Sequence, residues 1–297
     1  MSPHTKGVLF ALLGSVLWGA SGIGGQFLMQ SRGVGPEWFA SVRMIGAGIL
    51  LLLLDALRHR DIFFIWKDRR DAMSLLLFAV VGMVGVQYTY FKAIALSNAA
   101  TATILQYMMP FCVIGWESLC ARRLPSLRTF FCLFAAVGGT VLLVTRGEMG
   151  TLAITPAALA WGLSSAAAAA FYVAQPKTLI RRTRSSLVVG WGMLVGGLAF
   201  SPIARPWTPV GTFDTAALLA LAFVIVFGTA AAFWIYLASV ETIEPSEAGL
   251  LNSAEPLSSI AFSILFFSMA FGLPEIIGAL LIISAVCMTM RKGDKGN

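Results

Sequence analysis

The sequence predicts an all-α integral membrane protein in which ten transmembrane helices form two inverted five-helix repeats. Three observations lead to this prediction: an apolar composition, ten hydrophobic stretches, and a series of landmarks that recurs at a nearly constant spacing. Of the 297 residues, 58% are hydrophobic and 12% are charged, and the mean hydropathy is +0.83. A soluble domain of this length cannot bury so much apolar surface.

The hydrophobic stretches fill most of the chain and leave short connections. A transmembrane helix needs about 20 mainly apolar residues, and helices satisfy their own backbone hydrogen bonds in lipid. Strands of an outer-membrane barrel would instead alternate in pieces of about 10 residues. The first stretch is too long for the apolar part of a signal peptide, so we expect it to be retained. The expected spans are 7–29, 36–57, 72–96, 99–120, 125–145, 155–177, 185–204, 213–237, 245–267 and 273–290.

Lysine and arginine are distributed unevenly over the predicted connections. Sixteen of the 21 fall in one alternating set of loops and tails, and three fall in the opposite set. Cytoplasmic loops carry the excess of positive charge in membrane proteins, so we expect both termini in the cytoplasm. The same bias accounts for the net charge of +7. No nucleic-acid partner is expected, because no folded basic domain remains outside the spans.

Several landmarks of the first half recur in the second half. Met44 and Gly48 correspond to Met193 and Gly197, 149 residues later, and Leu124–Pro125 corresponds in the same way to Leu273–Pro274. Gln106 and Pro110 correspond to Asn252 and Pro256 at a spacing of 146. Because five is an odd number of spans, the second half would enter the membrane with reversed orientation. We expect one repeat in residues 1–150, an inverted repeat in 151–297, and a substrate site between them.

Two prolines lie near the middle of the fourth and ninth spans. Pro110 and Pro256 each lack an amide hydrogen and crowd the preceding turn, so each should kink its helix. Paired kinks at equivalent positions are compatible with a moving hinge and also with a static cavity wall. We take both prolines as candidate hinges.

Polar and aromatic side chains at mid-depth supply the candidate substrate site. Polar faces are costly in lipid and should point into the bundle, and aromatic walls stack flat or cationic solutes. Each residue also has a purely structural alternative, which is helix packing for the aromatics and interhelical hydrogen bonding for the amides. The candidate substrate-binding residues are Trp18, Gln87, Tyr88, Gln106, Tyr107, Trp161, Trp234, Asn252 and Glu255.

Three of the ionisable residues inside the predicted spans are of particular interest. Glu255 is about 15 Å deep by helix rise, where a charge costs about 2.5–3.5 kcal/mol on insertion scales. It is either a carboxylate that binds protons or a substrate amine, or a neutral acid bonded to a neighbouring helix. We expect Arg43 to bond helix carbonyls or a carboxylate, and Lys92 to extend to the membrane interface.

Enzyme chemistry is not predicted. Gly19-Ala20-Ser21-Gly22 resembles the serine motif of rhomboid proteases, but the required histidine base is missing from the spans, since the only histidines are His4 and His59. The four cysteines lack paired spacing, so neither a metal site nor a disulfide framework is expected. We expect no cofactor.

The chain resembles the EamA-type drug/metabolite transporter family over nearly its whole length. Within the family it is most similar to the bacterial aromatic amino acid exporters of the YddG type. The residues that carry the resemblance are Trp18-Gly19, Arg43, Tyr90-Phe91-Lys92-Ala93, Ala99-Ala100-Thr101-Ala102, Pro110 and Glu255-Pro256.

The resemblance implies a multi-pass protein of the bacterial inner (plasma) membrane that exports amino acids, aromatic ones included, and small flat xenobiotics. Export would proceed by alternating access through a central cavity. Two alternatives remain: a sugar-phosphate or nucleotide-sugar carrier, which would need several cationic residues in the cavity, and a membrane enzyme that does not transport. A monomer or a weak homo-oligomer is expected.

Overall fold

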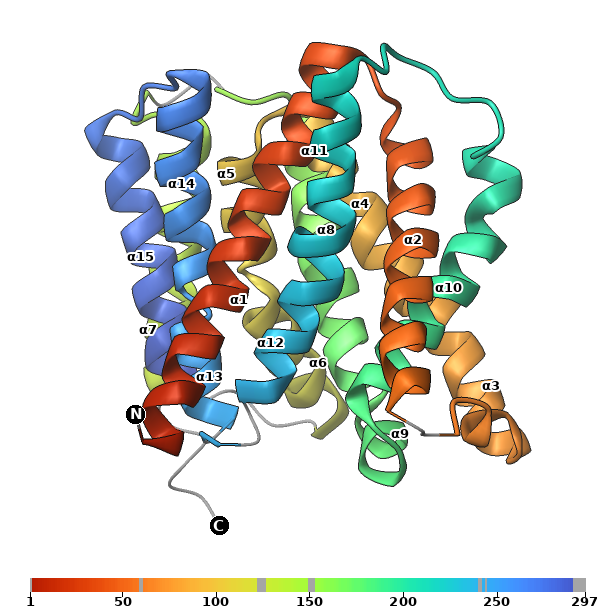
Figure 1. Cartoon of the computed structure of the whole chain (residues 1–297). Helices are drawn as coiled ribbons and strands as arrows, with labels where there is room; N and C mark the ends of the chain where they lie inside the picture. Colours follow the sequence, from red (N-terminus) through yellow and green to blue (C-terminus); the bar gives the residue numbers. More distant parts are fainter. Residues whose placement is uncertain are drawn as a thin grey trace.

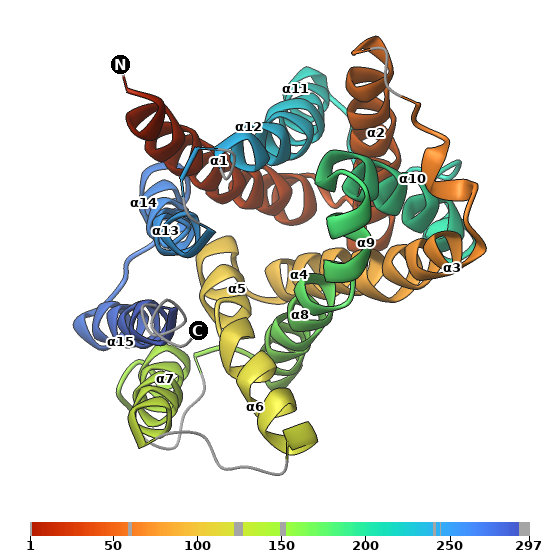
Figure 2. The ribbon, with the colours of Figure 1, turned by 90° about the horizontal axis from the view of Figure 1, so that it is seen from below.

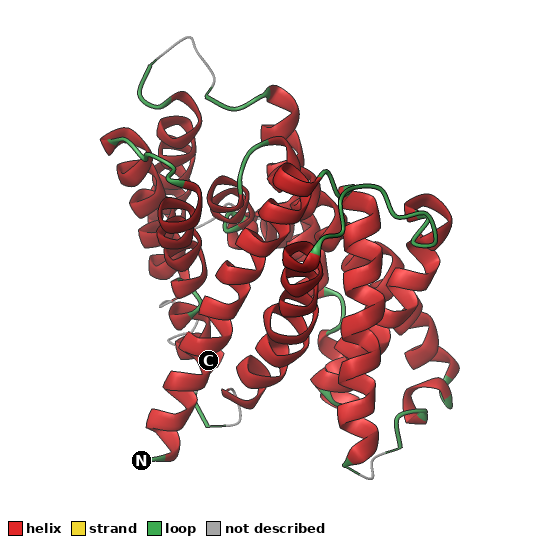
Figure 3. Ribbon diagram, turned by 45° about the horizontal axis from the view of Figure 1, so that its top comes forward, coloured by secondary structure: helices red, strands yellow, loops and turns green. Residues whose placement is uncertain are grey.

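The computed structural model describes residues 2–58, 61–121, 127–148, 153–239, 242–243 and 245–290. Every regular element within these ranges is a helix (Figures 1 and 3), so the predicted helical class is confirmed. Eight helical segments there are long and apolar enough to cross a membrane: Pro3–Ser31, Pro36–Leu57, Arg69–Leu96, Ala99–Trp116, Pro156–Arg182, Ser185–Ala204, Thr215–Ser239 and Glu247–Phe267. The fifth and tenth predicted spans correspond to the shorter apolar segments Phe130–Leu143 and Leu273–Met288.

Several predicted spans consist of more than one helical element. The elements are α1 (Pro3–Gln26), η1 (Phe27–Ser31), α2 (Pro36–Leu57), η2 (Phe64–Trp66), α3 (Arg69–Leu77), η3 (Phe78–Met83), α4 (Val84–Leu96), α5 (Ala99–Gln106), α6 (Met109–Ala121), α7 (Leu127–Thr145), α8 (Pro156–Ala174), α9 (Lys177–Arg182), α10 (Ser185–Ala204), α11 (Thr215–Ile225), η4 (Val226–Ala231), α12 (Ala232–Ser239), α13 (Pro245–Leu251), α14 (Ala254–Phe267) and α15 (Leu273–Met290).

The helices run roughly along one direction, with α1 beginning and α15 ending at the same end of the bundle (Figure 1). We call this end the near end and the opposite one the far end. Seen from the near end, α7 and α15 form a pair at one edge, while α2, α3 and α10 lie together at another (Figure 2). The main packing partners are α2 with α10, α7 with α15, α1 with α12 and α14, and α8 with α4, α5 and α6.

The fourth and ninth predicted spans are interrupted just before their prolines. Tyr107 and Met108 form a turn between α5 and α6, and Asn252 and Ser253 form a turn between α13 and α14. The two turns are 146 residues apart, as Pro110 and Pro256 are. A proline cannot donate to the preceding turn and its ring displaces that turn's carbonyl. The structure therefore has a break where the sequence predicts a kink.

The third and eighth predicted spans share an irregularity that has no sequence signal. The six-residue segments η3 and η4 are π-helical, and they begin 148 residues apart at Phe78 and Val226. In η4 the Thr229 hydroxyl donates to the carbonyl of Val224, five residues earlier, over 2.7 Å. Such wide turns are rare and are frequently found at functional sites.

Glycines allow α2 and α10 to approach closely. A Cβ atom on Gly48 would lie 2.6 Å from the backbone nitrogen of Leu194, and one on Gly197 would lie 2.7 Å from Cγ1 of Ile45. Small residues permit this kind of contact between helices in membranes. The Leu124–Pro125 landmark lies outside the described residues.

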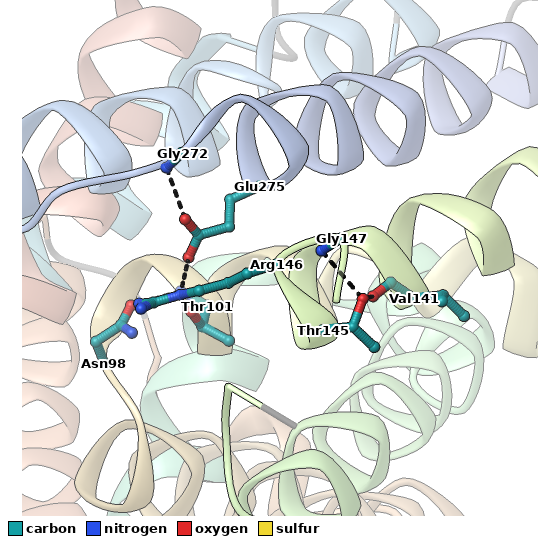
Figure 4. Close-up of polar contacts among 8 residues, drawn as sticks. All are labelled: Asn98, Thr101, Val141, Thr145, Arg146, Gly147, Gly272 and Glu275. Carbon is teal, nitrogen blue, oxygen red and sulfur yellow. Dashed lines mark hydrogen bonds and ion pairs between the residues drawn. The ribbon is translucent and has the colours of Figure 1, made fainter. Parts of the chain in front are cut away.

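A polar contact at the far end holds α7 against α15 (Figure 4). Arg146 Nε donates to Glu275 Oε1 over 2.9 Å, and the second carboxylate oxygen accepts from the Gly272 amide over 2.7 Å. Glu275 is only 6% exposed. In the same view, Asn98 Oδ1 caps α5 by accepting from the Thr101 amide over 2.8 Å.

Candidate functional site

Arg43 on α2 is held by two elements, α4 and η4. Its Nε donates to Thr229 Oγ1 over 2.6 Å, Nη1 donates to Gln87 Oε1 over 2.9 Å, and Nη2 reaches the Gly228 carbonyl at 3.5 Å. The guanidinium carbon lies 4.8 Å from the centre of the Phe91 ring. Arg43 is 5% exposed. It bonds a helix carbonyl, as the sequence predicts, together with a hydroxyl and an amide.

This arrangement gives Gln87 a structural partner. Its side-chain oxygen is occupied by Arg43, and only 7% of the residue is exposed. The π-helical segment η4 supplies both Gly228 and Thr229, so the wide turn places two acceptors beside the buried guanidinium. A buried charge without hydrogen-bond partners is strongly unfavourable. The contacts with Thr229, Gln87 and Gly228 therefore stabilise the buried Arg43 guanidinium.

The break between α13 and α14 contributes to a group of polar residues that we call the central cluster: Ser15, Trp18, Asn252 and Glu255. Asn252 lies in the break itself. Its Oδ1 accepts from Ser15 Oγ over 2.9 Å, and its Nδ2 donates to Glu255 Oε2 over a long 3.4 Å. Glu255 is half-buried, in the first turn of α14. Its carboxylate forms no ion pair with the residues that the structure describes.

Trp18 forms the aromatic part of the central cluster. Its ring lies 4.9 Å from Phe233 and 4.9 Å from Tyr236, both on α12. The indole nitrogen is buried and has no hydrogen-bond partner among the described residues. A buried donor without an acceptor is unfavourable, so this N–H would be stabilised by any acceptor that reached it.

Tyr107 connects the two helix breaks. Its hydroxyl lies 2.9 Å from Ser253 Oγ, and Ser253 Oγ lies 3.1 Å from Cys287 Sγ on α15. Gln106, the preceding residue, is half-buried at the end of α5. Its amide has no hydrogen bond to any residue in the described ranges.

A second group of side chains lies at the far end, and we call it the far-end cluster. Its members are Tyr88, Trp161, Glu37, Lys92 and Phe200. Tyr88 lies 5.4 Å from Trp161 and 5.3 Å from Phe200 between ring centres. Glu37 Oε1 accepts from Lys92 Nζ over 2.7 Å and from Tyr88 Oη over 3.1 Å. The structure thus separates two predicted residues from the central cluster.

Trp234 belongs to neither cluster. It is 37% exposed on α12, and the guanidinium of Arg58 lies 5.1 Å from its ring centre. Of the two histidines, His4 contacts Glu247 at 3.1 Å, and His59 lies outside the described residues. No three metal-ligating side chains gather anywhere in the described part of the chain.

Sequence reasoning did not identify Glu37, Phe233 or Tyr236, and it treated Ser15 as a small packing residue of the first span rather than as a site residue. Ser15 and Phe233 carry no signal of their own, because both residue types are common in transmembrane packing. Glu37 had a detectable signal: it begins a span and lies opposite Lys92 if the second and third spans are antiparallel neighbours. Only the packing of α2 on α4 brings the two side chains together.

These features describe a helical protein that, within the described ranges, has eight segments able to span a membrane and whose interior contains partly satisfied polar and aromatic groups. The EamA-like transporter family model matches residues 5–145 and again residues 156–291, and the chain belongs to this family.

A relative from Salmonella typhimurium (strain LT2) agrees with this assignment. It is named "Uncharacterized inner membrane transporter YicL", and it is 38% identical over 288 residues, which are 97% of this chain and 96% of the relative. A solved structure described only as "Crystal structure of protein" superposes with a TM-score of 0.66, at 14% identity, over 98% of this chain and 99% of that one. The latter likeness concerns the fold alone.

Proposed function

We propose that this protein exports amino acids, including aromatic ones, across the inner membrane by alternating access, in the manner of the YddG-type exporters that it resembles. Small flat xenobiotics are expected as further substrates. The central cluster is the proposed binding site in the middle of the membrane, and the two halves of the chain are the moving parts.

The proposed inverted repeats have four lines of support. The family model matches the chain twice, in the two proposed halves. The helix breaks recur at a spacing of 146, and two of the three π-helical segments in the described residues, η3 and η4, recur at 148. The packing is also reciprocal: α1 of the first half packs on α12 and α14, and α8 of the second half packs on α4 and α6. Transporters built this way place substrate where the repeats meet.

The single observation that carries the proposal is the state of the central cluster. Among the residues that the structure describes, the Trp18 indole N–H has no acceptor, and the Glu255 carboxylate has a single side-chain hydrogen bond, the 3.4 Å contact with Asn252. A substrate ammonium would bond Glu255, a substrate carboxylate would accept from Trp18, and the Trp18 ring would stack the side chain. Purely structural polar groups in a membrane are normally satisfied by their neighbours.

The sugar-phosphate alternative receives less support. A phosphate needs several cationic donors in one place. The Arg43 guanidinium is engaged by neutral acceptors, and Lys92 is a single cation beside the Glu37 carboxylate, whose negative charge would repel a phosphate. Arg43 donates to Thr229, Gln87 and Gly228, and Lys92 donates to Glu37. We therefore place amino acids first.

Counterflow in proteoliposomes tests the proposal. Purified protein loaded with unlabelled phenylalanine should accumulate labelled phenylalanine or tryptophan. Glu255→Gln should lower this flux by about tenfold or more, since charge-assisted bonds contribute about 1.5–3 kcal/mol. The matched control is Glu247→Gln, an acid outside the central cluster that contacts His4.

Two results would count against amino acid export. The first is the absence of counterflow with every amino acid of a full panel. The second is a flux inhibited by sugar phosphates, which would instead favour the alternative carrier.

A further inference from the structure

The far-end cluster contains opposite charges whose bonding capacity is only partly used. Lys92 Nζ carries three donors, and one of them bonds Glu37 Oε1 over 2.7 Å. Tyr88 Oη donates to the same oxygen over 3.1 Å. The carboxylate also accepts from the backbone amide of Glu37 itself, but Oε2 accepts no hydrogen bond from any other residue that the structure describes. Both charged side chains are 29% exposed, so the unused positions are within reach of a solute.

The unused donors of Lys92 and the unused acceptor positions of Glu37 are complementary to the two charged groups of an α-amino acid. An α-amino acid presents a carboxylate and an ammonium on a single carbon atom. Its carboxylate would accept from the free donors of Lys92, and its ammonium would donate to the free oxygen of Glu37. The existing contact between Lys92 and Glu37 need not break, because each partner uses a different atom or hydrogen for the solute.

An aromatic wall lies beside these charges. Tyr88 contacts Trp161 at 5.4 Å and Phe200 at 5.3 Å between ring centres, and Lys92 Nζ lies 5.9 Å from the centre of the Tyr88 ring. Aromatic rings in such arrangements favour offset or edge-on contact with another ring. The side chain that fits this wall is apolar or aromatic.

We propose that the far-end cluster is a second recognition site, specific for zwitterionic amino acids with apolar or aromatic side chains. In it Lys92 binds the α-carboxylate and Glu37 binds the α-ammonium. The site is the one that a substrate meets at the far end, after leaving or before entering the central cluster. The role of this site in transport rests on the proposed function.

A structural ion pair is the competing explanation, and energetics weighs against it. Partly exposed pairs contribute little to stability because water screens them and side-chain freedom is lost. Arg32–Asp214 is a comparable pair at the same end, with side chains 27% and 45% exposed. Its aromatic neighbour is one ring, Phe27, whose centre lies 4.7 Å from the Arg32 guanidinium, in place of a group of three, so this pair serves as the control.

The experiment compares binding and flux for three solutes: L-phenylalanine, phenethylamine, which lacks the carboxylate, and 3-phenylpropionate, which lacks the ammonium. Equilibrium binding to the purified full-length protein is measured beside counterflow. In the wild-type protein both analogues should bind about tenfold more weakly than phenylalanine, or weaker still.

The variants assign the two charges separately. Lys92→Gln should weaken phenylalanine binding by about tenfold and leave phenethylamine binding unchanged. Glu37→Gln should likewise weaken phenylalanine binding by about tenfold, and it should leave 3-phenylpropionate binding unchanged. The variants Lys92→Arg and Glu37→Asp should retain most of the affinity, which separates recognition from misfolding. Asp214→Asn should behave like the wild type.

The outcomes separate this inference from the proposed function. If phenylalanine is transported but Lys92→Gln and Glu37→Gln match Asp214→Asn, the second site is refuted and export stands. If phenylalanine binds in a way that depends on Lys92 and Glu37 but no flux is seen, export is refuted and the site stands. Absence of phenylalanine binding overturns the second site.

Discussion

Tyr107 and Ser253 lie 146 residues apart in the sequence, yet their hydroxyl oxygens are 2.9 Å apart in the structure. Each residue lies in the turn that interrupts a transmembrane segment, three residues before Pro110 or Pro256. The two breaks thus meet directly. A helix break concentrates bending at one point, and two breaks in contact can bend together.

We expect this contact to couple the two breaks. Tyr107→Phe and Ser253→Ala should each lower the free energy of unfolding by about 0.5–1.5 kcal/mol. The double variant should cost less than the sum, because both single changes remove the same hydrogen bond. Thermal unfolding of the detergent-solubilised protein measures this. Additive losses would show that the contact is not stabilising.

Arg43 should be required for folding rather than for substrate binding. Arg43→Met leaves the acceptors on Thr229, Gln87 and Gly228 without their donor, at a cost of about 1–3 kcal/mol for each buried group left unsatisfied. Arg43→Lys should rescue only in part, because an ammonium cannot match three diverging acceptors. The readout is the yield of monodisperse protein and its Tm. A stable Arg43→Met variant that has lost only flux would contradict this assignment.

The close approach of α2 and α10 should make Gly48 intolerant of larger residues. Gly48→Ala places a methyl group 2.6 Å from a backbone atom that cannot rotate away, so we expect about 1–3 kcal/mol of destabilisation from overpacking. Gly138→Ala is the control, since nothing lies within 4 Å of the added atom. Equal Tm values for the two variants would argue against the contact.

Acid should weaken the contact between Asp214 and Arg32. The pKa of Asp214 lies below its ordinary value of 3.8, because the Ala217 amide and then the Arg32 side chain hydrogen-bond its carboxylate. A lowered folded-state pKa stabilises the protein above the ordinary value, and this contribution disappears as the pH falls through the folded-state pKa. The stability of the wild type should therefore fall more steeply below pH 3.8 than that of Asp214→Asn. Parallel Tm curves over that range would contradict the expectation.

The positions of the helix breaks could be predicted from the sequence, and those of the π-helical segments could not. Proline acts on its own helix through its ring and its missing hydrogen, so Pro110 and Pro256 mark their breaks locally. A π-turn needs no particular residue type. The π-helical segment η4 lies where Gly228 and Thr229 accept hydrogen bonds from Arg43. Those hydrogen bonds depend on a helix nearly 190 residues away in the chain.

The sequence supplied candidate residues for the site but did not predict how they group in space. Trp18, Asn252 and Glu255 gather around one break, and Tyr107 lies at the contact between the two breaks. Tyr88 and Trp161 lie instead in the far-end cluster, Gln87 bonds Arg43, and Trp234 faces outward beside Arg58. Helical periodicity reports which residues share a face. It does not report which neighbouring helix that face meets.

The sequence alone determined that this chain is a membrane protein, that it is helical, and that its spans are separated by short connections. These properties follow from the length and polarity of each apolar stretch, which are set by the thickness of the bilayer and not by contacts with other helices. The tertiary structure alone decided that Glu37 meets Lys92 and that Tyr107 meets Ser253. Such contacts depend on the rotation and crossing of packed helices, which side chains from several distant segments set jointly.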